Sequence, residues 1–146
     1  MSAPRGILVL EDGLVLDGRP VAATGTAIGE MVFTTGMSGY QEAVTDPSYA
    51  GQLLCFAAPM IGNYGVDERV EESIKIQPSG LIVREAAQFA SHLRSTGRIQ
   101  EYLAARGVVA IEGIDTRAVT RRIRRHGVML GTITTTESAK AALERV

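Results

Sequence analysis

The sequence predicts an α/β fold: one domain in which a mixed, mostly antiparallel β-sheet or barrel-like layer carries helices on one side. Short apolar runs recur between turn signals, which is typical of β-rich proteins. Sixteen glycines in 146 residues favour many tight turns. The two clearest helical patterns come late in the chain, at 98–106 and 115–126. A chain of this length can build one core, so residues 1–146 are interpreted as a single domain.

The first third of the chain is predicted to be an antiparallel meander. Residues 7–10 form an apolar run, and Asp12-Gly13 is a hairpin signal before the next run at 14–16. Further turns at 17–18 and 24–25 precede a third strand at 27–34. Glu30 lies inside this strand, and a solvent-facing position is favoured over a catalytic role.

The segment 33–65 carries unusual backbone constraint, with five glycines and two prolines. Ser38 and Gln41 have the spacing of a capping box, which predicts a short helix at 40–44. The Asp46-Pro47 pair then ends that helix. Residues 52–58 are almost all apolar and predict a strand buried on both faces. This stretch is therefore expected to form fixed loops around one buried strand.

The remainder of the chain alternates strands and helices. Strands are predicted at 73–76, 81–84, 108–111 and 128–134, and residues 86–93 are ambiguous. Asp115 is expected to cap a helix that ends at His126, before Gly127. A last helix is predicted at 137–145.

Composition narrows the classes of function. The net charge is −1 and the isoelectric point about 6.1, which is typical of a soluble globular protein and disfavours a nucleic-acid partner. No apolar run approaches the length of a membrane span, and no secretory signal is evident. The single cysteine, Cys55, excludes an internal disulfide and fits a cytoplasmic location.

Four sequence motifs carry a family resemblance. GYQEAVTDPSYAGQ at 39–52 and PMIGNYG at 59–65 come between LVLEDG at 8–13 and GIDTRAVTRRIR at 113–124. In this order they resemble the N-terminal domain of the small chain of glutamine-dependent carbamoyl phosphate synthetase. The resemblance implies a three-layer β/β/α domain of the swivelling type. It also implies that the amidotransferase domain, which carries the catalytic cysteine, histidine and glutamate, is absent from this chain.

Ser48 is the candidate substrate-binding residue. From local sequence alone it is a turn serine after Pro47, although a fixed loop can present a hydroxyl to a ligand. The resemblance implies that Ser48 helps to position glutamine, opposite the amidotransferase domain. No catalytic residue is assigned to this chain.

Cys55, His92 and His126 offer an alternative, a stand-alone hydrolase. Cys55 lies in an apolar strand, where burial makes a thiol inert, so a structural role is favoured. The two histidines have no carboxylate partner evident from spacing, and two histidines alone do not make a zinc site. No metal site is predicted.

The helix at 115–126 has an arginine face. Arg117, Arg121, Arg124 and Arg125 fall within a wedge of about 100°, with Arg122 on its flank. A solvated face, a nucleic-acid-binding or other interaction module, and a docking surface are the three possible interpretations. Because the resemblance implies a large synthetase chain as partner, docking on that chain is favoured over nucleic acid.

The resemblance carries three further expectations. Gly36, Ser38 and Gly39 are a candidate loop beside a passage that carries ammonia toward the large chain. ATP and magnesium are expected on the large chain, with no cofactor in this domain. The complete enzyme would make carbamoyl phosphate from glutamine, bicarbonate and ATP, for arginine and pyrimidine synthesis.

Overall fold

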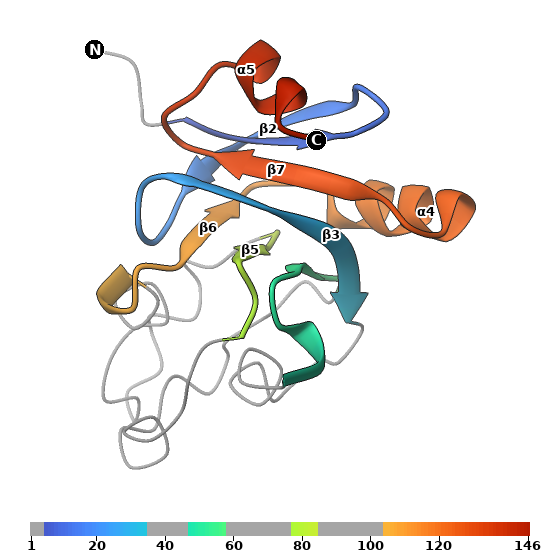
Figure 1. Cartoon of the computed structure of the whole chain (residues 1–146), viewed down its shortest axis with the longest axis horizontal. Helices are drawn as coiled ribbons and strands as arrows, with labels where there is room; N and C mark the ends of the chain where they lie inside the picture. Colours follow the sequence, from blue (N-terminus) through green and yellow to red (C-terminus); the bar gives the residue numbers. More distant parts are fainter. Residues whose placement is uncertain (1–4, 35–46, 58–76, 85–103) are drawn as a thin grey trace.

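The computed structural model describes residues 5–34, 47–57, 77–84 and 104–146, and within them seven strands close into a barrel (Figure 1). The strand order around the barrel is β1-β2-β6-β5-β4-β3-β7. The strands are β1 (Gly6–Leu10), β2 (Val15–Pro20), β3 (Thr26–Thr34), β4 (Leu53–Phe56), β5 (Gly80–Ile82), β6 (Val109–Glu112) and β7 (Leu130–Thr134). The predicted α/β domain with a mixed, barrel-like sheet is confirmed.

One part of the barrel is antiparallel. β1 pairs with β2 through the predicted hairpin, and β7 lies between β1 and β3. The turn of the hairpin is held by Asp12, whose side chain accepts a hydrogen bond from the Leu14 N–H, and by Gly13 at φ 95°. The predicted meander is wrong at β3, which pairs with β7 and not with β2. Neighbouring strands usually pair, but β2 is bonded on its other edge to β6, from far along the chain.

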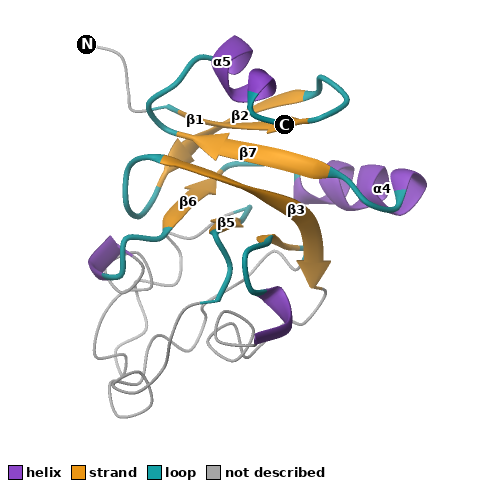
Figure 2. Cartoon of the chain, in the orientation of Figure 1, coloured by secondary structure: helices purple, strands orange, loops and turns teal. Residues whose placement is uncertain are grey.

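The other part of the barrel is parallel. β3 pairs with β4, β4 with β5, and β5 with β6, all in the same direction. β4, β5 and β6 are buried along their whole length, which explains their nearly continuous apolar sequence. Because these four strands run in the same direction, their carboxyl ends lie at the same edge of the barrel. In Figure 2, β3, β5 and β6 lie on the side of β7 that faces away from α5 (Ala139–Glu144).

The barrel interior forms the main core. Its fully buried side chains come from the strands on all sides and from the segments that flank α4 (Thr116–His126). They include Leu8, Leu10, Met31, Leu53, Ile82, Ile111, Ile114, Met129 and Ile133. Cys55 is also fully buried there, on β4. Because this core fills the barrel, ligands have access only to its outer surface and its ends.

Within the described residues, two helices, α4 and α5, pack on the barrel. α4 packs against β3 and β4 through Val119 and Ile123. It begins as predicted, with the Asp115 side chain accepting from the Ala118 N–H, and ends at Gly127, where φ is 78°. The shorter α5 packs against β1 and β7.

Several predicted elements lie outside the described residues. They are the helix at 40–44, the strand at 73–76, the segment 86–93 and most of the helix at 98–106. The described end of that last helix closes as predicted at Gly107, where φ is 71° and the N–H bonds to the Ala104 carbonyl. No helix within the described ranges has the length and apolar character needed to cross a bilayer.

Candidate functional site

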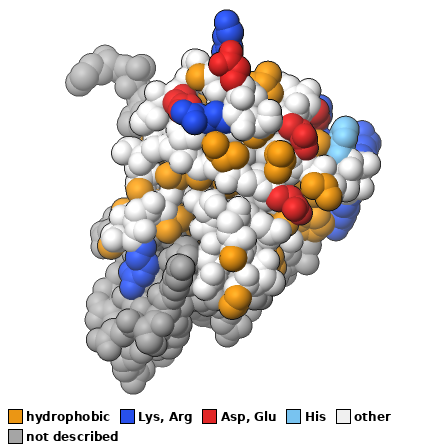
Figure 3. Space-filling view, viewed as in Figure 1, with side chains coloured by type: hydrophobic (Ala, Val, Ile, Leu, Met, Phe, Trp, Pro, Cys, Tyr) orange, Lys and Arg blue, Asp and Glu red, His pale blue; other side chains and the backbone are white. Residues whose placement is uncertain are grey.

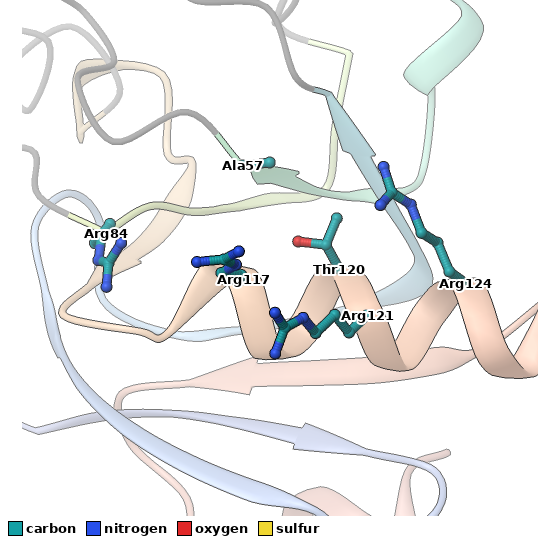
Figure 4. A pocket seen from close by; sticks show the side chains of 6 residues that line it. All are labelled: Ala57, Arg84, Arg117, Thr120, Arg121 and Arg124. Carbon is teal, nitrogen blue, oxygen red and sulfur yellow. The ribbon is translucent and has the colours of Figure 1, made fainter.

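A pocket of about 430 Å³ lies beside α4, at the edge where the parallel strands end (Figure 4). Among the residues that the structure describes, four arginines and two small residues line it, and they come from three segments of the chain. They are Ala57, Arg84, Arg117, Thr120, Arg121 and Arg124. We call these six residues the arginine pocket.

Backbone hydrogen bonds fix the segments that form the arginine pocket. Ala57 directly follows β4, and its N–H donates to the Thr34 carbonyl at 2.9 Å. Arg84 follows β5 by two residues, and its carbonyl accepts from the Gly113 N–H at 2.9 Å. Because Gly113 lies three residues before α4, this bond ties Arg84 to the start of the helix. The walls of the pocket are therefore held by the sheet itself.

The sequence predicted part of this charged cluster. Arg117, Arg121 and Arg124 were expected on one face, and they do line one pocket. Arg125 is exposed but does not line it. Arg84 was missed, because it lies 33 positions before Arg117 and no local pattern links the two. In Figure 3, basic side chains gather beside a histidine at the end of the molecule formed by α4.

Among the described residues, no ion pair involves the four pocket arginines. The pairs that form there use Arg5, Arg19, Arg122 and Arg145 instead. Arg124 is positioned by an aromatic contact, since its guanidinium carbon lies 5.1 Å from the centre of the Phe33 ring. The hydroxyl of Thr120 donates to the Thr116 carbonyl. The positive charge of the pocket thus meets no carboxylate from the described part of the chain.

The other side of α4 carries a different charged group. Asp12 accepts a hydrogen bond from Arg122, and its Oδ2 lies 3.8 Å from Nε2 of His126. The sequence showed no carboxylate partner for His126, and this contact supplies one. Burial alone would raise the pKa of Asp12. The hydrogen bonds from Arg122 and Leu14, and the charges of Arg122 and His126, outweigh burial and lower that pKa below its ordinary value.

Cys55 is inert in its position on β4, as the sequence predicted. Its side chain is fully buried, and burial raises the pKa of the thiol to about 12. His126 is half exposed on α4 and paired with Asp12, while His92 lies outside the described residues. Within the described residues, no three side chains are grouped as metal ligands.

Ser48 lies on a short 3₁₀ helix, η1 (Pro47–Tyr49), just before β4. Ser48 is exposed. The backbone that follows it is held by hydrogen bonds from the Gly51 N–H to the Gln77 carbonyl and from the Ser79 N–H to the Gln52 carbonyl. Ser48 is not among the residues that line the arginine pocket, which begins beyond the other end of β4. Gly36, Ser38 and Gly39 lie outside the described residues.

The described residues thus form an α/β barrel domain with an arginine pocket at the carboxyl edge of its parallel strands. Residues 8–133 match the model of a known family, described as carbamoyl-phosphate synthase small chain, CPSase domain. The match covers most of the sequence, and the chain belongs to this family.

Curated relatives agree with this assignment. The carbamoyl phosphate synthase small chain of Nitratidesulfovibrio vulgaris is 50% identical over 139 residues, which are 95% of this chain and 37% of the relative. That of Streptomyces coelicolor is 50% identical over 84% of this chain and 32% of its own. That of Salmonella typhi is 46% identical over 95% of this chain and 37% of its own. The chain therefore spans about a third of the length of the relatives it matches.

Proposed function

We propose that this chain acts as the N-terminal domain of the small chain in a glutamine-dependent carbamoyl phosphate synthase. The observation that supports the proposal is the family match over 8–133, on a domain with the predicted mixed, barrel-like sheet. The complete assembly would hydrolyse glutamine and combine the ammonia with bicarbonate and phosphate from ATP. ATP and magnesium would bind to the large chain. The product would enter arginine and pyrimidine synthesis in the cytoplasm.

In this proposal Ser48 forms one wall of the glutamine site. Its exposed position on η1, with the backbone behind it bonded to 77–79, suits a residue that positions a substrate. The amidotransferase domain would supply the other wall and the nucleophile. This chain alone should therefore show no glutamine binding by calorimetry, and binding in the micromolar range would contradict the shared site.

The role of Ser48 is tested in a complete small chain assembled with its large chain. Ser48→Ala should raise KM for glutamine about tenfold, the scale of one lost hydrogen bond to a charged substrate group. Activity with added ammonia should stay unchanged, because ammonia bypasses the glutamine site. Thr136→Ala, at an exposed turn, is the matched control. An unchanged KM for glutamine would remove Ser48 from the site.

The arginine face of α4 is proposed to dock on the large chain. Arg117, Arg121, Arg124 and Arg125 are exposed, and none of them forms an ion pair within the described residues. Planar guanidinium groups pair well with carboxylates across an interface. Charge reversal at Arg121 and Arg124 should therefore weaken docking, and an unchanged affinity would exclude both residues from the interface.

A further inference from the structure

The arginine pocket lies where the fold favours ligand binding. Ala57 follows β4, Arg84 follows β5, and α4 follows β6, so the pocket lies at the carboxyl ends of adjacent parallel strands. In sheets of parallel strands, ligands commonly bind at this edge, because the loops and helix starts that leave the strands surround it. The position of the pocket is thus suited to a small ligand.

Within the described residues, all charged side chains that line the pocket are arginines, which favour an anion. Four arginines line this space, and each guanidinium offers a planar set of donors that matches phosphate or carboxylate oxygens. In Figure 4, Arg117 and Arg121 lie between Arg84 and Arg124, and the Arg124 guanidinium is turned toward β3. Ala57 is apolar, and the Thr120 hydroxyl already donates to the Thr116 carbonyl. Within the described residues, no acidic side chain lines the pocket to oppose an anion.

The pocket is partly arranged before any ligand arrives. Phe33 holds the Arg124 guanidinium from one end, and the bond from Gly113 fixes the backbone of Arg84 at the other. Arg117 and Arg121 project from successive turns of α4 between them (Figure 4). Such preorganisation lowers the entropy that a ligand must lose in ordering the site.

We propose that the arginine pocket binds a small oxyanion that carries two or more negative charges, built from phosphate or carboxylate groups. Its volume of about 430 Å³ is in the range of ligand pockets and exceeds what one phosphate group fills. Four positive charges favour a polyanion over a monoanion. Arg117, Arg121 and Arg124 also belong to the proposed docking face, so the anion would bind while that face is uncovered, and the test uses this chain alone.

The test is titration calorimetry of the chain with pyrophosphate, with tricarballylate and with an acetylated tetraglutamate peptide, all at equal ionic strength. Wild-type protein should bind pyrophosphate or tricarballylate with one saturable site. Arg84→Gln and Arg121→Gln should each weaken that binding about tenfold or more, the scale of one lost bidentate contact. Arg125→Gln removes the same charge from the same helix outside the pocket and should change the affinity less than about twofold.

Three results would overturn the proposal. One is the absence of saturable binding by either small anion. Another is an equal loss of anion affinity in Arg121→Gln and Arg125→Gln, which would indicate diffuse electrostatic attraction by the whole helix. The third is tighter binding of the acidic peptide than of both small anions, which would leave these arginines only the docking role proposed above. Unchanged thermal midpoints of the variants would show that each one folds.

Discussion

Asp12 and Arg122 join two distant parts of the chain: the Oδ2 atom of Asp12 lies 2.5 Å from Nε of Arg122, 110 positions later. Asp12 belongs to the turn between β1 and β2, and Arg122 to α4. The Asp12 side chain is 18% exposed and that of Arg122 39%, so this pair is partly shielded from water. It therefore ties the helix that forms the arginine pocket to the antiparallel part of the barrel.

Replacing Asp12 by Asn should lower the free energy of unfolding at pH 7 by about 1 kcal/mol, the scale of a partly shielded ion pair. The pKa of Asp12 is lower in the folded state than in the unfolded chain. The contribution of its carboxylate to the free energy of unfolding is therefore fully present above the pKa that Asp12 has in the unfolded chain. The contribution is lost as pH falls through the folded-state pKa. Urea unfolding at pH 7 and at pH 3 should therefore show a difference between wild type and variant that shrinks in acid.

Asp17→Asn is the matched control for that measurement. Asp17, on β2, pairs with Arg5, which lies just before β1, but both side chains are about two-thirds exposed, so solvent screens the pair. Its loss should cost clearly less than the loss of Asp12. Equal costs would show that the Asp12–Arg122 pair has no special role.

The strands and α4 were predictable because their signals are local. The apolar runs at 7–10 and 52–58 correspond to β1 and β4, and the Asp115 cap and Gly127 bound α4 as expected. Strand pairing was less predictable, since β3 bonds to β7 and β2 to β6 across long stretches of chain. A pattern within one strand does not say which distant strand will lie beside it.

The same limit applies to the candidate site. The helical spacing of Arg117, Arg121 and Arg124 placed them on one face. The contribution of Arg84, and the partnership of Asp12 with Arg122, depend on contacts between segments far apart in sequence. Ser48 came from the family resemblance, because its local sequence predicts only a turn, and its role stays a prediction.

Gly18 should tolerate no side chain. A Cβ atom at this position on β2 would overlap the backbone carbonyl oxygen of Glu112 on β6, which cannot move without breaking the pairing of the two strands. Gly18→Ala should therefore lower the free energy of unfolding by about 2 kcal/mol or more. Chemical denaturation of the purified variant measures this.

Gly131→Ala provides the comparison for Gly18→Ala. There the added Cβ would lie 2.7 Å from Sδ of Met31, the flexible part of a side chain that can adjust. Its cost should be about 1 kcal/mol or less. A larger loss in Gly131→Ala than in Gly18→Ala would contradict the packing described for the β2–β6 pair.

The Cys55 thiol should make the protein sensitive to alkali. Its pKa is raised in the folded state from 9.0 to about 12, so the unfolded chain releases this proton first as pH rises. The contribution of the buried neutral thiol to the free energy of unfolding is complete below pH 9 and is lost as pH rises from there toward 12. Cys55→Val cannot ionise, so by pH 10.5 the stability of wild type should fall by about 2 kcal/mol relative to this variant.

Urea unfolding of both proteins at pH 8 and pH 10.5 measures that change. A difference that stays constant between the two pH values would mean that the thiol is not shielded by the barrel. Rapid modification of Cys55 by a thiol reagent in the folded protein at pH 8 would have the same meaning.

Titration calorimetry of this chain with a carbamoyl phosphate synthase large chain tests the proposed role most directly. We predict saturable binding with one site, and a loss of affinity of about tenfold or more on charge reversal at Arg121 and Arg124. Lys140→Glu, at an exposed position of α5, should leave the affinity unchanged. No saturable binding, or an equal loss of affinity for the large chain in Lys140→Glu, would contradict the proposal that this chain is a docking domain.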